Sequence, residues 1–400
     1  MTTLDVTSTS AISQAQQAIA KKLFTYYNPP NTVDGTLMPL NAGTTTAGYE
    51  WYEGGICWGA VFEYARVSGD GQYSQDVNKG LQAASYGSVG SFLGVDKEIN
   101  GLIGRWNDDI QWWGLATTTG AELFGANTNI PGGVTYEALA QSRLDQNAQR
   151  KYYKSAITNS QAINIGARLY LLTKNQTYID NSMKIYNWMM SSKIVGSDFA
   201  VYDGLLADST CALSGVQLSY NAGFLAGALA WLYKASGNQD VIKTAESIAL
   251  KSLQTFSKNG IIADLCEPNC LVYVVSPKGL HVRGLQYVYM YSQNADVKSQ
   301  IKAALQKSAQ SLAQYCDDQW SCNAQSWSGP QIAADVHLQT NALELFNALA
   351  ATNGVSSSVT NVPAANTIGG AATTSKNGAT NALSETWVVV LSFLTFFFAQ

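Results

Sequence analysis

The sequence predicts an all-α protein with a single folded domain, an (α/α)6 barrel in which six helical hairpins close into a ring. One local pattern recurs along the chain: an apolar helix rich in Ala, Gly and Tyr, a short polar turn, and an amphipathic helix. The turns are spaced by roughly fifty to a hundred residues, which is too irregular for a solenoid but suits a ring with long loops at one mouth. A content of 46% hydrophobic and 11% aromatic residues in 400 provides for a large core.

Four polar turns mark the predicted hairpins, at residues 68–73, 173–178, 236–241 and 292–297. Around the third turn, Ala226, Leu229 and Tyr233 fall at helical spacing before the turn, and Ile242 and Ala249 do so after it. Each turn is therefore expected to join two helices.

Two shorter apolar segments, residues 115–124 and 338–349, are expected to supply the remaining two hairpins. Small residues such as Gly223 and Gly227 would let inner helices approach closely. Alternating hydrophobicity over residues 271–275 predicts a short β-strand, inserted in the barrel and not part of a second domain.

The composition changes near the C-terminus, so we divide the chain into a barrel domain at 1–354, a Ser/Thr/Ala/Gly-rich linker at 355–386 and an apolar tail at 387–400. Small residues, a polar spacer and a terminal apolar tail are typical of a GPI-attachment signal, with Asn377 the best-placed attachment residue and Ser375 or Gly370 as alternatives. A buried C-terminal helix or strand is the alternative. The N-terminus lacks an apolar stretch, so we expect that a signal peptide has been removed and Met1 added.

Charge and cysteine content narrow the functional classes. The net charge is −4, from 24 Lys and Arg against 28 Asp and Glu, which provides no basic field for nucleic acid or anionic lipid. The close pairs Cys266/Cys270 and Cys316/Cys322 favour disulfides in an oxidising compartment. A zinc site is the alternative, but only two histidines are present and neither has ligand spacing, so we expect no metal. Asn175 lies in the only N-glycosylation sequon.

The segment from Gly104 to Gly114 places Asp108 and Asp109 among three tryptophans. Aromatic rings stack on the CH faces of a pyranose, and two carboxyl groups can divide the cleavage of a glycosidic bond between them. Adjacent helical residues point about 100° apart, so both carboxylates reach one substrate only at a helix N-terminus or in a loop. There the helix dipole would keep one aspartate ionised, while burial would raise the pKa of the other. Alternatively, the pair only caps a helix, and a second pair, Asp317-Asp318, is interpreted as part of a solvated disulfide loop.

Several motifs resemble glycoside hydrolase family 76, the endo-α-1,6-mannanases, and within it the fungal GPI-anchored cell-wall branch. The most specific is Trp106-Asn107-Asp108-Asp109 followed by Trp112-Trp113. Supporting matches lie at residues 51–58, 132–134, 152–159, 220–223 and 278–279. The resemblance covers roughly residues 5–350 and implies an (α/α)6 barrel.

The resemblance also implies a retaining mechanism without a cofactor, with Asp108 as the nucleophile and Asp109 as the general acid/base. The residues expected to bind substrate are Trp51, Trp106, Trp112, Trp113, Tyr220, Asn221 and Lys278.

The expected function is a retaining endo-α-1,6-mannosidase or transglycosidase of the fungal cell wall. Its expected partners are α-1,6-mannose glycans, the GPI-anchor core glycan and a β-glucan acceptor, and the protein would be a monomer held at the cell surface by a GPI anchor. One alternative is a non-catalytic mannan-binding surface protein. Another is an inverting hydrolase or lyase on the same fold, although a lyase usually acts on acidic sugars, which a net acidic chain disfavours.

Overall fold

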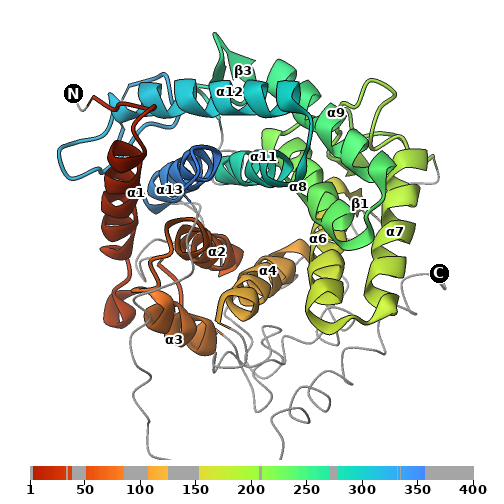
Figure 1. Cartoon of the computed structure of the whole chain (residues 1–400), viewed down its shortest axis with the longest axis horizontal. Helices are drawn as coiled ribbons and strands as arrows, with labels where there is room; N and C mark the ends of the chain where they lie inside the picture. The colour runs from red at the N-terminus through yellow and green to blue at the C-terminus, as the bar shows by residue number, and fades with distance from the viewer. Residues whose placement is uncertain are drawn as a thin grey trace, which may run out of the picture.

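The computed structural model describes residues 3–32, 35–37, 51–84, 107–124, 153–206, 210–270, 277–330, 332–333 and 335–355, and it is a ring of helices in two layers (Figure 1). The inner layer consists of α2 (Trp51–Ser68), α4 (Asn107–Phe124), α6 (Ala156–Thr173), α8 (Ser219–Ser236), α11 (Lys278–Tyr291) and α13 (Val336–Thr352). Each inner helix contacts the next in this order, and α13 closes the ring against α2. The predicted (α/α)6 barrel is confirmed.

The outer layer consists of α1 (Thr9–Phe24), α3 (Ser74–Ala84), α7 (Gln176–Ser191), α9 (Gln239–Thr255) and α12 (Ala295–Ala313). A single 3-10 turn, η1 (Pro29–Asn31), follows α1. Helix α1 packs on α13, α3 on α2, α7 on α6, α9 on α8, and α12 on α11 and α13. Outer helices bury one stripe, whereas α8 is buried on every side from Asn221 to Leu232, which explains the apolar and amphipathic alternation of the sequence.

All four predicted turns join an inner helix to an outer one. In three of them an asparagine ends the turn and caps the outer helix: the side-chain oxygens of Asn175, Asn238 and Asn294 accept hydrogen bonds from backbone N–H groups of α7, α9 and α12. Such caps satisfy donors that have no partner within the helix. The similar form of the turns thus has a common physical cause.

Small residues let inner helices approach closely, as expected from the sequence. A Cβ atom at Gly223 would lie 2.3 Å from the ring of His281 in α11, and one at Gly227 would lie 2.6 Å from Gly284. Both spacings are too short for any side chain, so α8 and α11 pack backbone against backbone.

Within the described residues, two pairs of short strands lie beside the helices of the ring. Strand β1 (Lys154–Ser155) pairs antiparallel with β2 (Gly204–Leu205), and β3 (Ser257–Lys258) pairs antiparallel with β4 (Ile261–Ile262). The strand predicted at residues 271–275 lies outside the described residues, as does the chain beyond residue 355. No helix among the described residues combines the length and apolar character needed to cross a bilayer.

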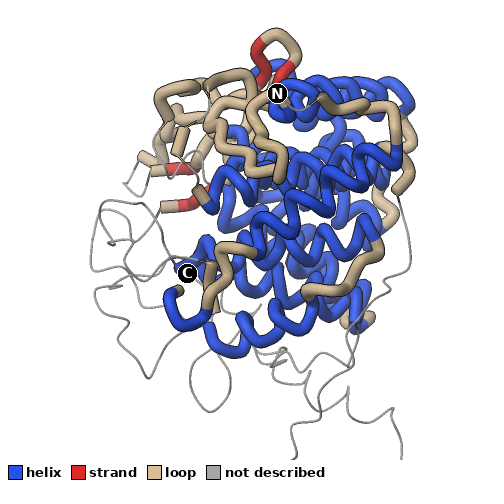
Figure 2. The backbone as a smooth tube through the Cα atoms, turned by 90° about the vertical axis from the view of Figure 1, so that its left-hand side faces the viewer, coloured by secondary structure: helices blue, strands red, loops and turns tan. Residues whose placement is uncertain are grey.

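The short turns all leave the C-terminal ends of inner helices, so the inner helices run parallel and their N-terminal ends share one mouth of the ring. Longer loops and the β1–β2 pair gather at one end of the ring, on the left of Figure 2. Six helix N-termini therefore face this mouth, and each brings partial positive charge from unsatisfied N–H groups.

Buried ion pairs join the inner helices, one group near their C-terminal ends and one pair in their middle. Glu122 of α4 accepts hydrogen bonds from Arg66 of α2 and Arg168 of α6, and Arg283 of α11 pairs with Glu344 of α13. Both Arg66 and Arg168 also lie over the Trp231 ring of α8, at 5.7 and 5.0 Å from its centre. The first group joins α2, α4, α6 and α8, and the second pair joins α11 to α13, and pairing compensates the cost of burying the charges.

Both close cysteine pairs form disulfides, Cys266–Cys270 and Cys316–Cys322. Cys57 is a buried thiol and Cys211 is exposed. Among the described residues, no group of His, Cys, Asp and Glu is arranged to hold a metal ion.

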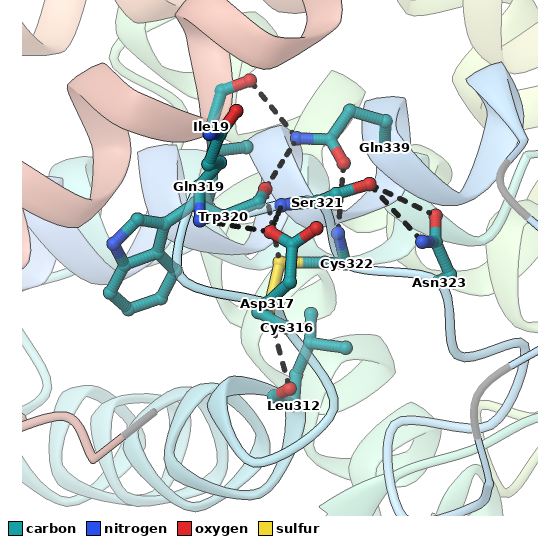
Figure 3. Close-up of a disulfide and its surroundings, with 10 residues drawn as sticks. All are labelled: Ile19, Leu312, Cys316, Asp317, Gln319, Trp320, Ser321, Cys322, Asn323 and Gln339. Carbon is teal, nitrogen blue, oxygen red and sulfur yellow. Dashed lines mark hydrogen bonds between the residues drawn. A yellow bond between two sulfur atoms is a disulfide. The ribbon is translucent and has the colours of Figure 1, made fainter. Parts of the chain in front are cut away.

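The Cys316–Cys322 loop is built around Asp317, whose carboxylate accepts hydrogen bonds from the N–H groups of Gln319 and Ser321 (Figure 3). Buried Gln339 of α13 accepts from Cys322 N–H at 3.0 Å and donates to the carbonyls of Trp320 and Ile19. The loop is thereby attached to both α13 and α1. Asp317 and Asp318 are exposed, so the interpretation of this pair as a solvated loop is confirmed.

Candidate active site

The two adjacent aspartates lie where the sequence pattern required them, in the first turn of α4. Helix α4 begins at Asn107, so Asp108 and Asp109 follow directly, at the mouth of the ring. First-turn N–H groups have no intrahelical partner, and the helix dipole favours carboxylates there. This position allows two consecutive carboxylates to approach a substrate from different sides.

Asp108 is partly buried, and its desolvation raises the pKa of its carboxyl group to about 6. A hydrogen bond from the Thr158 side chain of α6 opposes this rise, and the nearby charge of Asp203 adds to it. Gln161 of α6 donates to the Asp108 backbone carbonyl at 3.2 Å and so ties the start of α4 to its neighbour. A carboxyl group with this pKa changes charge within the mildly acidic range.

Asp203 is a third carboxylate of the site, and β2 positions it. Its backbone carbonyl accepts a hydrogen bond from Ala156 N–H at 2.7 Å, at the start of α6. Its side chain accepts from the Tyr153 hydroxyl and, at 2.8 Å, from the Asn221 amide of α8. Burial, and then the hydrogen bond to Asp203, raise the pKa of Tyr153, so this hydroxyl stays protonated and donates. The β1–β2 pair therefore brings Asp203 to the mouth beside α4, α6 and α8.

Tyr220 and Asn221, expected from the resemblance to line the sugar groove, lie in the first turn of α8. Burial, followed by the negative charges of Asp203 and Asp108, holds the pKa of Tyr220 well above its usual value. Tyr220 therefore lies close to the carboxylates and keeps its proton. The structure brings Tyr220 close to Asp203 and Asp108 and Asn221 to Asp203, and sugar binding by both residues stays a prediction.

Lys278, at the first position of α11, is fully engaged by the protein. Its ammonium group pairs with Glu267 and lies 4.2 Å from the centre of the Trp327 ring. Glu267 in turn accepts a hydrogen bond from Asp264 N–H, and Asp264 accepts one from Ser219 N–H at the start of α8. With 1% of its side chain exposed, Lys278 positions the loop that carries the Cys266–Cys270 disulfide, instead of contacting sugar directly as expected.

A buried histidine links the first and last inner helices at the mouth. His337 Nε2 lies 2.8 Å from the Glu53 carboxylate of α2, and its Nδ1 lies 3.0 Å from the Asp335 carboxylate that caps α13. Burial alone would lower the pKa of His337, but the hydrogen bonds to Asp335 and Glu53 raise it to about 9. At neutral pH this imidazolium holds α2 and α13 together.

The expectation that Trp112 and Trp113 stack on sugar is corrected. Trp113 has no exposed surface and packs so closely on Gly54 of α2 that a Cβ there would lie 2.8 Å from its ring. Trp112 is 3% exposed and meets Phe224 of α8 edge to face at 5.2 Å. Both rings follow the first turn of α4 and so lie inside the ring, in its core.

Other predicted positions lie outside what the structure describes: Trp106, the side chain of Trp51, and Asn377. Asn175 is partly exposed, and its side-chain oxygen caps α7, so glycosylation at this residue stays a prediction. Asp203, Glu53 and Asp335 are single acids in the sequence, with no motif around them. Glu53 and Asp335 lie at the N-terminal ends of α2 and α13, and Asp203 precedes β2 and contacts the start of α6, so the fold brings all three to the mouth.

Comparison with known proteins agrees with this fold. The model of the family described as Glycosyl hydrolase family 76 matches residues 11–361. The mannan endo-1,6-alpha-mannosidase DCW1 of Saccharomyces cerevisiae is 27% identical, over 88% of this chain and 84% of the relative. A putative mannan endo-1,6-alpha-mannosidase of Schizosaccharomyces pombe, C970.02, is 24% identical over 82% of this chain and 78% of its own length.

Solved structures share the architecture. Dfg5 from Chaetomium thermophilum, in complex with glucosamine, superposes with a TM-score of 0.72 at 22% identity, covering 87% of this chain and 91% of that one. An inactive variant of the α-1,6-mannanase GH76A of Salegentibacter sp. HEL1_6, in complex with α-1,6-mannotriose, has a TM-score of 0.69 at 15% identity, over 85% and 99% of the two chains. At these identities the likeness establishes the fold.

Proposed function

This chain belongs to glycosyl hydrolase family 76 and is a glycoside hydrolase, and from that premise we propose that it is a retaining endo-α-1,6-mannosidase of the fungal cell surface. The observation that carries the proposal is the placement of Asp108 and Asp109 in the first turn of α4, with Asp108 desolvated beside Asp203. The printed names of the fungal relatives support α-1,6-mannan as the substrate class.

In this mechanism the Asp108 carboxylate attacks the anomeric carbon of an α-mannosyl unit while Asp109 donates a proton to the glycosidic oxygen. The bond to the leaving sugar breaks, and a glycosyl-enzyme ester forms on Asp108. Asp109, now a carboxylate, takes a proton from water, whose oxygen attacks the anomeric carbon and releases Asp108. Two inversions restore the α-configuration.

The surroundings of Asp108 suit this role. Thr158 and the N-terminal dipole of α4 stabilise the Asp108 carboxylate. Burial removes part of its hydration, which keeps the carboxylate nucleophilic. Tyr220 lies near the same carboxylates and stays protonated, so its hydroxyl can donate to a sugar oxygen. Asp203 fixes Asn221 and Tyr153 around the reacting position.

We further propose that a sugar hydroxyl can replace water in the second step. The acceptor would be a β-glucan and the donor the mannose of a GPI-anchor core glycan, so that the enzyme links anchored proteins to the wall. The expected attachment at Asn377 supports this version, because a GPI anchor would hold the enzyme at the surface where both sugars lie.

The test is incubation of the protein with α-1,6-mannotetraose, with and without a laminarin oligosaccharide, followed by product and anomer analysis. Asp108→Asn and Asp109→Asn are the catalytic variants. Asp318→Asn is a matched control, because it alters the other Asp-Asp pair in an exposed loop. Products with retained configuration, lost in both catalytic variants and kept in the control, support the mannosidase. Binding of the tetrasaccharide without cleavage would favour the mannan-binding protein instead.

A further inference from the structure

A groove lies on the outer surface of the ring, between α1 and the turn that joins α2 to α3. Its volume is about 730 Å³, and it is an open depression of the surface, not an enclosed cavity. Its lining includes Gln14, Gln17, Ala18 and Lys21 from one face of α1, together with Gln72 and Tyr73 from the turn. The turn follows the C-terminal end of α2, so it is about 27 Å, the length of that 18-residue helix, from the end that faces the mouth.

The groove has a rigid aromatic floor. The Tyr73 ring stacks on Phe24 with centres 4.1 Å apart and planes 16° from parallel. Phe24 in turn packs on the buried Trp58 ring at 6.0 Å. Because the Tyr73 ring is already held in place, little conformational entropy is lost when a ligand binds to it, and this favours affinity.

The rim of the groove is polar and nearly uncharged. Gln14, Gln17 and Gln72 are exposed, and each side-chain amide carries two donors and an acceptor. One donor of Gln72 is bonded to the Asp70 carboxylate, and one donor of Gln14 reaches the Ser10 hydroxyl at 3.5 Å, so their carbonyl oxygens and remaining N–H groups face a ligand. A pyranose has the complementary surface, with hydroxyl groups at its edges and apolar CH faces. From this match we propose that the groove is a second binding site, separate from the catalytic mouth, for a neutral glycan chain.

Other partners fit less well. Lys21 is the only cation in the described lining, too little charge for nucleic acid or anionic lipid. Within the described part of the chain, the large exposed apolar side chains lie outside the groove, so a protein partner would lack the anchors that dominate protein interfaces. A second glycan site would keep a polymer close to the mouth and raise its effective concentration there. That the glycan is α-mannan rests on the proposed function, whereas its neutral character rests on the groove alone.

The experiment measures polymer binding by affinity electrophoresis of the full chain carrying Asp108→Asn and Asp109→Asn, so that the polymer is not cleaved and the mouth is the same in every protein compared. The probes are α-1,6-mannan and laminarin. The groove variant is Gln14→Ala/Gln17→Ala, and the matched control is Gln300→Ala/Gln310→Ala, which removes exposed glutamines from another outer helix, α12. Loss of two amide contacts should weaken binding by about tenfold in the groove variant only.

Ala18→Arg, which fills the groove from a half-buried position on α1, provides a second variant with the same expectation. In the catalytically intact protein, both variants should raise KM for the mannan polymer and leave kcat and mannotriose cleavage unchanged. Selective loss on either polymer supports the groove and identifies its glycan. Equal binding by groove variants and control on both polymers overturns it. If the protein proves inactive on mannans, the electrophoresis still reports on the groove.

Discussion

Replacing the proposed nucleophile should make the protein more stable at neutral pH. Burial raises the pKa of Asp108 from 3.8 to about 6, so the folded protein holds a proton there that the unfolded chain has lost. Stability therefore falls as pH rises through this interval, because unfolding then allows Asp108 to ionise in water. Asp108→Asn keeps the size of the side chain and removes its ionisation.

The size of the effect follows from the two pKa values. For a group with pKa 3.8 in the unfolded chain and about 6 in the folded one, the loss of stability is about 3 kcal/mol at pH 7 and less than about 1 kcal/mol at pH 4. Asp108→Asn should recover this difference. Its free energy of unfolding should exceed that of the wild type by up to about 3 kcal/mol at pH 7 and match it closely at pH 4.

Equilibrium urea unfolding, followed by far-UV circular dichroism at the two pH values, measures this difference directly. Asp318→Asn, in the exposed disulfide loop, should leave the unfolding midpoint unchanged at both. The reasoning fails if Asp108→Asn is destabilised at pH 7, or if its advantage over the wild type is the same at pH 4 as at pH 7. Either outcome would mean that Asp108 is not desolvated in the folded state.

Three further outcomes are expected. If Asp108 is the nucleophile, kcat/KM should rise with pH through about 6, and Asp203→Asn should move this rise to lower pH, because it removes a negative charge near Asp108; a fall in kcat/KM above pH 6 would instead make Asp108 the acid. The raised pKa of His337, about 9, contributes stability below pH 6.5 that is lost as pH rises through 9, so the wild type should lose about 3 kcal/mol over this interval and His337→Gln should not, as urea midpoints will show. Cys316→Ser/Cys322→Ser should lower the free energy of unfolding by about 2 kcal/mol, the entropic value for so short a loop, and an unchanged urea midpoint would contradict that estimate.

Local patterns in the sequence predicted the helices well. The turn ending at Asn238 is recognisable because its cap is a neighbour in sequence, and the apolar run from Asn221 to Leu232 is recognisable because burial on all sides removes polar residues. Ring closure was inferred from the irregular spacing of the turns and from the family resemblance, because it depends on contacts between α13 and α2 from opposite ends of the chain.

Only part of the site could be predicted from the sequence, because the rest depends on contacts between residues that are far apart in the chain. Asp108 and Asp109 are adjacent, so one segment reveals them, whereas Asp203 reaches them through a two-residue strand that no sequence period marks. The prediction that Trp112 and Trp113 bind sugar was wrong because it assumed that residues close to Asp108 in sequence also lie close to the substrate. Trp112 lies one turn beyond Asp108 on the same helix face, and in a parallel ring one turn deeper is already the core.

Because the inner helices are parallel, the catalytic carboxylates lie at one end of the barrel and the stabilising arginine ion pairs lie toward the other. At the mouth, helix N-termini favour carboxylates, which lets Asp108, Asp203 and Glu53 gather there although burial of such groups costs free energy. At the other end, helix C-termini favour cations, and there Arg66 and Arg168 share Glu122 over a tryptophan. Those ion pairs join neighbouring helices far from the reacting groups, so they can stabilise the barrel while the buried carboxylates at the mouth destabilise it. A higher free energy of unfolding in Asp108→Asn would show that the catalytic carboxylate lowers stability and that the rest of the barrel compensates for it.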